Sequence, residues 1–517
     1  MKIERTRNTG RNMLAGGVLK LFQMLVPFAM RTMLIYYMGA EYLGLSSLFK
    51  SVLQVLNLAE LGVGSAMVYA MYKPIADDDE DMIRALMRLY RTYYRVIGLV
   101  IAGVGLALTP LIPKLVNGEL PGGLNIYILY LMNLGATVLS YWLFAYRNCL
   151  LSAYQRNDVA SLILLGSQVL QYALQAVIVI FLKDYYLYVL AILIGQAANN
   201  VGAAIASKRM FPAFSPKGDL PKEKRDDINR RIRDLFISKL GGVVLGSADT
   251  IVISAFLGLT VLAEYQNYFF IVSSVYGFVE VLLNSMLAGI GNSMVTESAE
   301  KNYRDMRKIF VLFTCLVFGC ACCFTGIFQP FMRLWMGEEL MLPFGMVLSF
   351  TLFFIVYEYT RFFNTFKNAA GEWHQDRFRP LISAVTNLCL NLMMIRFLGL
   401  YGIIWSSVAA LAFVEIPWLL SNIFSTVYRD YTLLGFLKEV LVYLLGGVLA
   451  WALTALAAVF LPAGGWGVFF VSALFSVLIP CALFLLMFRR LSVFREALAL
   501  MDKMTRHKLP IKRLMGE

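Results

Sequence analysis

The sequence predicts an all-α polytopic membrane protein, and three observations support this fold class. The 517-residue chain is 59% hydrophobic and has a mean hydropathy of +0.68. Only 15% of its residues are charged, whereas a soluble domain carries about 25%. Apolar runs of twenty or more residues, each long enough to cross a bilayer, recur from Met13 to Phe488 and leave no room for separate soluble domains.

About 14 transmembrane helices are expected, because the apolar runs lie between charged or Gly/Pro-rich breaks. The first six spans cover about 13–38, 42–72, 92–113, 124–146, 160–182 and 186–207. Eight more follow at about 235–258, 263–292, 309–329, 342–366, 380–398, 402–427, 438–460 and 467–488. We predict an N-terminal lobe of helices 1–6 (1–207), a basic cytoplasmic connector (208–234), a C-terminal lobe of helices 7–12 (235–427), and helices 13 and 14 with a basic cytoplasmic tail (428–517).

The basic residues predict that both ends of the chain are cytoplasmic. With the N-terminus inside, 39 of the 46 Lys and Arg residues fall on cytoplasmic segments and only four on outer segments: Lys114, Lys183, Arg333 and Arg396. This bias over an even number of spans is the positive-inside pattern of a multi-pass protein. It also accounts for the net charge of +13 without nucleic acid as a partner. The first apolar run is too long for a signal-peptide core of about 7–15 residues, so we expect it to remain as an anchor.

A weak internal repeat relates the two predicted lobes. The segment 38–43 pairs with 257–262, and the segment 62–67 pairs with 289–294. Six helices return the chain to its starting side, so the lobes would be parallel repeats about an axis along the membrane normal. Substrate sites in such transporters lie between the repeats, near the bilayer midplane. Chance similarity between apolar helices is the alternative.

Several kinds of chemistry are excluded by residue type and spacing. The seven cysteines lie in or beside apolar runs without the spacing of a zinc site or a disulfide framework. The two histidines, His374 and His507, lie outside the apolar runs. No phosphate-binding loop of the G-x-x-x-x-G-K-[ST] type occurs. We therefore expect no metal and no cofactor. The acidic run 77–81 fits a helix cap from Asp79 or Asp81 better than a divalent-metal motif.

Polar side chains line one face of each of the first two spans. An ionisable group inside a bilayer needs a partner, a wet cavity or a route to the interface. At 100° per residue, each set falls on one arc of its helix, and the two sets are Lys20, Gln23, Pro27 and Arg31, then Lys50, Gln54, Asn57 and Glu60. We predict a substrate cavity here. The alternative is that the three cations extend to the nearer interface.

The predicted C-terminal lobe carries mainly acidic groups inside its spans. They are Asp249, Glu280, Glu358 and Glu415, with Arg361 close to the inner end of its helix. Asp249, Glu280 and Glu415 are candidates for coupling transport to an ion. Each acid could instead be protonated and hydrogen-bonded to a neighbouring helix. The i, i+3 spacing of Glu358 and Arg361 favours a structural pair.

Three stretches of sequence point to a family. A lead with Arg7, Arg11 and Asn12 precedes the first span. The next turn reads Tyr37-Met38-Gly39-Ala40-Glu41-Tyr42-Leu43-Gly44, and the seventh span reads Asp249-Thr250-Ile251-Val252-Ile253-Ser254-Ala255-Phe256-Leu257-Gly258, followed by Tyr265. With the 6 + 6 + 2 arrangement of spans, these stretches resemble Wzx-type polysaccharide biosynthesis proteins of the multidrug/oligosaccharidyl-lipid/polysaccharide (MOP) exporter superfamily.

The resemblance implies a MATE-like fold and a flippase in the bacterial cytoplasmic membrane. Its substrate would be a lipid-linked oligosaccharide, typically on undecaprenyl diphosphate, that moves to the outer leaflet for capsule, O-antigen or related surface polysaccharides. The implied partners are membrane lipid, a polysaccharide polymerase and glycosyltransferases. Related lipid II flippases use cationic cavity residues on helices 1, 2 and 8. Arg31 and Lys50 match the first two by position, whereas helix 8 offers Glu280 and no cation in its apolar span.

Three other functions compete with a flippase. Cation-coupled multidrug antiporters of the same superfamily commonly carry a helix 1 carboxylate, but helix 1 here has Lys20, Arg31 and no acid. A membrane-embedded enzyme would be expected to show a large outer loop or paired catalytic His and Asp residues, and every predicted outer segment is short. A non-transporting scaffold for the glycan machinery stays open. We predict a transporter rather than an enzyme.

Overall fold

The computed structural model is helical throughout the part of the chain that it describes, residues 5–118, 120–372, 375–461 and 465–504. Thirteen of the described helices are long and apolar enough to cross a membrane. One further pair, Ile126–Trp142 with Ala145–Ala153, is bent by 45° and brings the number to 14 if it forms a single span. These helices confirm the predicted all-α class and the expected number of spans.

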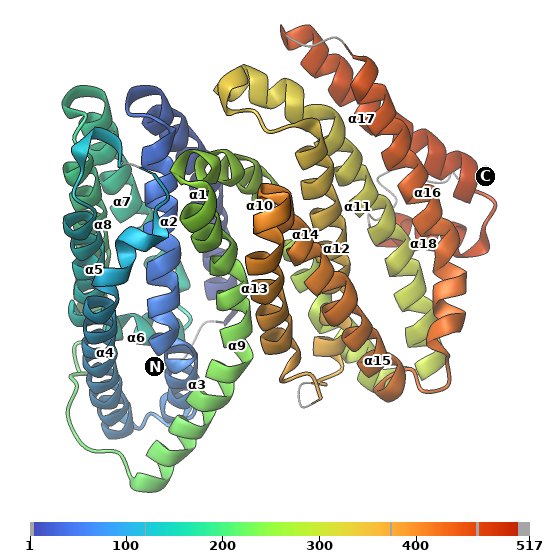
Figure 1. Cartoon of the computed structure of the whole chain (residues 1–517). Helices are drawn as coiled ribbons and strands as arrows, with labels where there is room; N and C mark the ends of the chain where they lie inside the picture. Colours follow the sequence, from blue (N-terminus) through green and yellow to red (C-terminus); the bar gives the residue numbers. More distant parts are fainter. Residues whose placement is uncertain (1–4, 119, 373–374, 462–464, 505–517) are drawn as a thin grey trace. The chain divides into compact units, whose positions relative to one another are not determined.

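The first of two compact units covers Met1–Gln266. Within it α1 packs on α7, α7 on α8, and α4 on α5, and α9 runs beside α2 and α3 (Figure 1). Its helices are α1 (Arg5–Tyr37), α2 (Ala40–Leu56), η1 (Asn57–Glu60), α3 (Val63–Ala76), α4 (Glu80–Leu108), α5 (Ile126–Trp142), α6 (Asn148–Ala153), α7 (Asn157–Val177), α8 (Tyr185–Met210), α9 (Lys222–Leu257) and the start of α10 (Leu259–Thr296).

The second unit covers Asn267–Glu517 and is built around α11. This helix packs against α12, α16, α17 and α18. Ring contacts such as Phe324 with Phe354, 5.0 Å between centroids, join α11 to α12. Beyond the rest of α10, the helices are α11 (Ala299–Met336), α12 (Phe344–Ala369), α13 (Arg379–Leu398), α14 (Leu400–Ala410), η7 (Leu411–Glu415), α15 (Ile416–Thr426), α16 (Leu433–Phe460), α17 (Gly465–Phe488) and α18 (Ser492–Met504).

The compact units divide the chain later than the lobes that the sequence pattern suggests. The division falls after Gln266, and α9, the seventh predicted span, packs against α2 and α3 of the first unit. The repeat places the same span at the start of the second lobe. Compactness and repeat are separate properties, so the lobe boundaries at 207 and 235 stay a prediction.

The predicted connector is held to the start of α4 by polar contacts. Arg84 Nε donates to the carbonyl of Ala213 at 3.0 Å. Arg88 donates to the carbonyl of Gly218 and forms a salt bridge with Asp219, both at 3.1 Å. Nearly half of the expected connector, residues 222–234, is helical, because α9 begins at Lys222. The basic tail from 505 onward lies outside the described residues.

The acidic run before α4 caps that helix. The Asp79 carboxylate accepts a hydrogen bond from the Met82 amide at 3.0 Å, as the sequence predicted for an N-cap residue. Within the described residues, no group of three or more His, Cys, Asp or Glu side chains has the arrangement of a metal site.

The second span is broken, although the apolar pattern predicts one helix over 42–72. Helix α2 ends at Leu56, a single turn of 3₁₀ helix follows, and Gly62 adopts φ +89° before α3 begins. A Cβ on Gly62 would lie 2.6 Å from Cβ of Leu235 in α9. Glycine is therefore required here by both its backbone conformation and its close neighbour.

One of the two repeat pairings has a structural counterpart. Gly39 and Gly258 precede α2 and α10 with positive φ (124° and 89°) and extended ψ (162° and 178°). The two turns also touch: a Cβ on Gly44 would lie 2.2 Å from the Leu259 carbonyl oxygen. The other pairing differs, because Gly62 marks a helix break whereas Gly289 lies inside the unbroken α10.

Candidate anion site in the first unit

Arg31 on α1 and Lys50 on α2 are brought together in the first unit. The two cations lie within electrostatic range of each other. The Lys50 side chain is exposed, although its neighbours Phe49 and Ser51 are buried. Among the described residues, Lys50 forms no salt bridge. The pair forms a concentration of positive charge inside a predicted span, which suits an anion.

Arg31 is held in place by helices α9 and α10. Its Nη1 donates to the Gln266 carbonyl at 3.2 Å, and the Gln266 side chain donates to Thr250 Oγ1 at 3.0 Å. Tyr172 and Tyr188, from α7 and α8, also lie within electrostatic range of the guanidinium. Residues from α7, α8 and α10 thus surround one cation, and α9 supports it through Gln266, which limits its freedom to reorient.

Among the described residues, Lys20 and Gln54, both predicted site residues, form no hydrogen bond with this pair. Lys20 is exposed and lies eleven residues before Arg31, about 16 Å along the axis of α1. Gln54 is exposed one turn after Lys50. The neighbouring Gln23 is engaged elsewhere, because it donates to Gln168 Oε1 of α7 at 3.4 Å. The polar face of α1 therefore serves partly in packing against α7.

Asn57 and Glu60 belong to the break in the second span and face tyrosines. The Tyr94 hydroxyl donates to Glu60 Oε1 at 2.9 Å, and the Tyr141 hydroxyl donates to Asn57 Oδ1 at 3.1 Å. Tyr90 donates to the Tyr94 hydroxyl at 2.6 Å and extends the chain of hydroxyls. Because Tyr94 and Tyr141 are buried, these bonds hold the broken turn rather than present free groups to a substrate.

Asp249 lies in α9 beside Thr250, the hydroxyl that accepts from Gln266. Of the three candidate coupling acids, it is the one in the unit that holds Arg31. The contacts place it on the helix that supports the cation site.

Glu280 and Glu358 have surroundings in the second unit that the sequence did not predict. Arg361 Nη2 forms a salt bridge with Glu280 Oε1 at 2.8 Å. The expected pair of Glu358 with Arg361 is wrong. Glu358 is fully buried, and both its carboxyl oxygens are without a hydrogen-bond partner among the described residues. The eighth predicted span, α10, has no cation of its own near Glu280. Arg361 of α12 supplies the positive charge beside it.

Glu415 belongs to a buried network of four charged residues. Arg379 forms salt bridges with Glu415 and Asp376, and Asp376 also pairs with Lys367 at 2.7 Å. Each of the four residues is at most 5% exposed. Two cations and two anions balance, so no uncompensated charge is buried within this network of α12, α13 and η7. A coupling role for Glu415 would require this pairing to open.

The sequence missed the tyrosines and the Asp376 network. Tyr94 and Tyr141 lie on α4 and α5, far in sequence from Glu60, and nothing in their local pattern marks them as its partners. Asp376 and Arg379 were visible as an i, i+3 pair of opposite charge. That spacing could have identified a structural salt bridge in the segment that leads into α13.

Comparison with known proteins finds solved structures that share the fold of this chain. No family model and no curated protein sequence matches the chain. The solved structure of the lipid II flippase MurJ, in an inward closed conformation, matches with a TM-score of 0.66 and 13% identity over 92% of this chain and 99% of MurJ. An inward-facing multidrug resistance MATE family transporter of the MOP superfamily matches with a TM-score of 0.62 and 14% identity over 81% of this chain and 99% of its own.

The chain has the MOP transporter fold. A eukaryotic MATE transporter, AtDTX14, also shares the MOP fold, with a TM-score of 0.52 and 11% identity over 82% of this chain and 97% of its own. These neighbours are transporters and flippases, as predicted, rather than enzymes. Since the MOP fold serves both a lipid II flippase and multidrug transporters, the choice of substrate depends on the side chains of the site.

Proposed function

We propose that the protein is a flippase that moves a lipid-linked oligosaccharide, carried on undecaprenyl diphosphate or a similar polyprenyl carrier, across a bacterial cytoplasmic membrane. The observation that carries this proposal is the juxtaposition of Arg31 and Lys50 in the first unit. Two like charges inside a membrane span repel each other, and an anionic ligand would relieve this repulsion.

The charge pair suits the chemistry of the carrier. A diphosphate cannot cross hydrocarbon without hydrogen-bonding and charge compensation, while a polyprenyl tail can stay in lipid. Arg31 offers a fixed, planar set of donors, and Lys50 offers a mobile point charge with three. Charge-assisted hydrogen bonds from both groups would neutralise the diphosphate. The exposed amide of Gln54 would then accept or donate to sugar hydroxyls, and Lys20 would attract the anion at a distance.

The main alternative is a cation-coupled multidrug antiporter, because MATE transporters share the fold. A site for organic cations needs negative charge or aromatic faces. The proposed site instead combines two cations within electrostatic range of each other, and Glu60, the carboxylate among the predicted site residues, accepts a hydrogen bond from Tyr94. The charge of the site therefore favours an anionic substrate.

Energy coupling is proposed at Asp249. It lies on α9, next to the Thr250–Gln266 contact that holds Arg31. Glu280 and Glu415 are weaker candidates, because both belong to the second unit, which does not hold Arg31. A proton or sodium ion that binds at Asp249 would change the charge next to the supports of Arg31 and so its hold on the diphosphate.

The proposal includes orientation and partners. The positive-inside pattern predicts that both termini are cytoplasmic, so the substrate would enter from glycosyltransferases on the cytoplasmic side. A polysaccharide polymerase would consume it on the outer side for a capsule, O-antigen or related polymer. Alternating access by movement of the two repeats would connect the two sides.

Flipping in proteoliposomes tests this function. A fluorescent undecaprenyl-diphosphate oligosaccharide is incorporated, and its exposure in each leaflet is followed for wild type, Arg31→Ala and Lys50→Ala. Loss of a charge-assisted hydrogen bond of about 1.5–3 kcal/mol predicts at least tenfold slower flipping for each variant. Lys50→Arg should restore much of the rate, because it returns the charge.

Arg396→Ala provides the matched control. Arg396 is an exposed arginine in the last turn of α13, in the second unit, and its loss should leave flipping unchanged. Melting temperature and membrane abundance are measured for every variant. Normal flipping by Lys50→Ala, in a protein that melts like wild type, would contradict the proposed site.

A further inference from the structure

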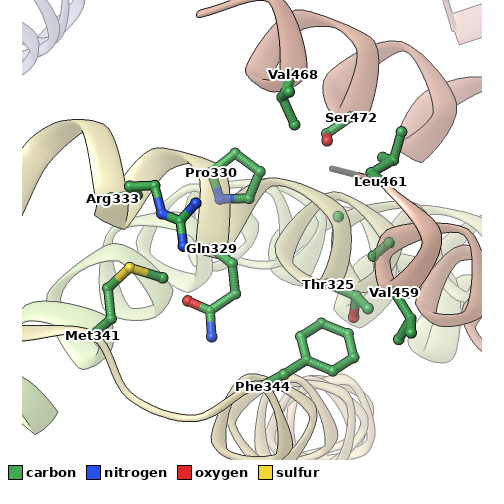
Figure 2. A pocket seen from close by; sticks show the side chains of 12 residues that line it. Thr325, Gln329, Pro330, Arg333, Met341, Phe344, Val459, Leu461, Val468 and Ser472 are labelled. Atoms are coloured by element: carbon green, nitrogen blue, oxygen red, sulfur yellow. The ribbon is translucent and has the colours of Figure 1, made fainter. Parts of the chain in front are cut away.

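A cavity of about 300 Å³ lies in the second unit between α11, the start of α12 and the α16–α17 hairpin (Figure 2). It belongs to a different unit from the Arg31–Lys50 site and is independent of the proposed function. Its walls are mainly apolar and include Pro330, Phe344, Val459 and Val468. Its volume is at the lower end of the range for ligand sites, about 300–1,000 Å³.

The cavity lies at the C-terminal end of α11, which the span prediction puts at the outer membrane interface. Arg333 lies in the last turn of α11, Phe344 begins α12, and Leu461 follows the end of α16. The helices α11 and α17 run antiparallel here, because Phe331 meets Phe469 while Gly326 meets Ser476. The cavity thus starts at an interfacial arginine and continues into the depth of the bilayer.

The antiparallel register places Ser472 about one helical turn deeper than Arg333. Ser472 lies level with Gln329 and Pro330 of α11. These two residues precede Arg333 by four and three positions, a distance of about 5 Å along the helix axis. Figure 2 shows the Ser472 hydroxyl directed toward the space between Thr325, Pro330 and Gln329. A charged group and a hydroxyl therefore face the cavity at two defined depths.

The Ser472 hydroxyl is buried without a hydrogen-bond partner among the described residues. The residue as a whole is 1% exposed. Pro330 leaves a second polar group without its usual partner. A proline has no amide proton, so it cannot donate the helical hydrogen bond to the Gly326 carbonyl. A buried hydroxyl without a partner costs about 1–3 kcal/mol, so an acceptor at this depth would stabilise the site.

The other polar groups of the cavity are already engaged. Gln329 Nε2 donates to the Leu342 carbonyl at 2.7 Å, and its Oε1 accepts from Tyr268 at 3.2 Å. Thr325 Oγ1 accepts from Trp451 at 2.7 Å. Arg333 uses Nε on Glu338 at 3.3 Å, and an arginine has further N–H groups to donate. The groups left for a ligand are one cation at the mouth and one hydroxyl below it.

We propose that this cavity binds one chain of an anionic, ester-linked glycerophospholipid. The phosphate accepts hydrogen bonds from Arg333, an ester carbonyl accepts from the Ser472 hydroxyl, and the acyl chain fills the apolar walls. The order matches the lipid: phosphate at the interface, ester below it, hydrocarbon deepest. A bound lipid would fill the space between α11 and the α16–α17 hairpin and so couple the hairpin to the rest of the second unit.

Native mass spectrometry of the purified full-length protein tests the site with two lipids of equal chain length, ester-linked and ether-linked phosphatidylglycerol. The ether lipid lacks the carbonyl. Wild type should retain the ester lipid about three- to tenfold better, the value of one neutral hydrogen bond. Ser472→Ala should abolish this preference and leave ether-lipid binding unchanged. Because the preference is a ratio within one protein, it does not depend on how well each variant is expressed.

Two further variants test the charge and the cavity. Arg333→Gln should weaken both lipids about tenfold or more, whereas Arg396→Gln, at the exposed end of α13, should not. Val468→Phe should block binding by filling the cavity, and Val471→Phe, on the exposed face of the same helix, should not. Equal retention of ester and ether lipids by wild type would overturn the proposal. Undecaprenyl phosphate that displaces phosphatidylglycerol at equal concentration would also overturn it, since that lipid has no ester.

Discussion

At the residue scale, two glutamates of the second unit differ in what surrounds them. Glu280 is partly exposed and bridges to Arg361 at 2.8 Å. Glu358 is fully buried, and its carboxyl oxygens have no hydrogen-bond partner among the described residues. A carboxyl group in such a site loses its hydration without a hydrogen bond to replace it. The structure therefore assigns opposite effects on stability to the two side chains.

Removal of the Glu358 carboxyl should stabilise the protein. Glu358→Met keeps a side chain of similar length and removes the buried polar group, with an expected gain of about 1–3 kcal/mol and a rise in melting temperature of several degrees. Glu280→Met should lower the melting temperature, because Arg361 loses its carboxylate. Thermal unfolding in one detergent compares the two variants. A lower melting temperature for Glu358→Met would show that Glu358 has a stabilising partner.

The contrast between Glu358 and Arg361 shows what residue spacing can and cannot predict. The i, i+3 spacing was correct as geometry on one helix, but Arg361 turned to Glu280 on α10. Arg31 and Lys50 were predicted as site residues from their position in apolar runs, and the fold brings them together. In contrast, the tyrosines that bind Glu60 come from α4 and α5, and only tertiary packing determines those partners.

At the element scale, the break in the second span is the main departure from the expected helices. Hydrophobic runs predict where spans lie, because a bilayer demands length and apolarity. They do not predict the break at Asn57–Gly62, because its cause is a contact with Leu235 of α9, far along the chain. The break orients Asn57 toward Tyr141 and Glu60 toward Tyr94.

Gly62→Ala tests the importance of the break. The substitution places a Cβ in a left-handed conformation and 2.6 Å from Leu235 Cβ, so we expect a loss of about 1–3 kcal/mol and a lower melting temperature. Gly103→Ala is the matched control. Gly103 is an exposed helical residue of α4 with no atom within 4 Å of an added Cβ, so alanine there should be neutral or stabilising. Equal melting temperatures for both variants would contradict the strained break.

At the scale of the whole molecule, the distribution of charge predicts orientation. The four basic residues on predicted outer segments contrast with 39 on predicted cytoplasmic segments. Alkaline phosphatase fused after Gly118 should be active, and the same enzyme fused after Ser215 should be inactive. Green fluorescent protein fused after Glu517 should fluoresce. An active phosphatase at Ser215 would reverse the proposed topology and the direction of transport.

The fold and the site contribute different parts of the functional argument. The likeness to MurJ and to MATE transporters gives the architecture, with 13% and 14% identity. It does not distinguish an anionic lipid from an organic cation. In the proposed function, the sign of the charge at Arg31 and Lys50 makes that distinction, and this charge was readable from the sequence because cations are rare in membrane spans.

A direct comparison of two substrates in the same proteoliposomes tests the central claim. Wild-type protein is supplied with a labelled undecaprenyl-diphosphate oligosaccharide and with a fluorescent organic cation, each with and without a proton or sodium gradient. The account predicts flipping of the oligosaccharide carrier, at least tenfold slower in Lys50→Ala, and no transport of the cation. Gradient-driven transport of the cation without flipping of the carrier would contradict the account and identify an antiporter.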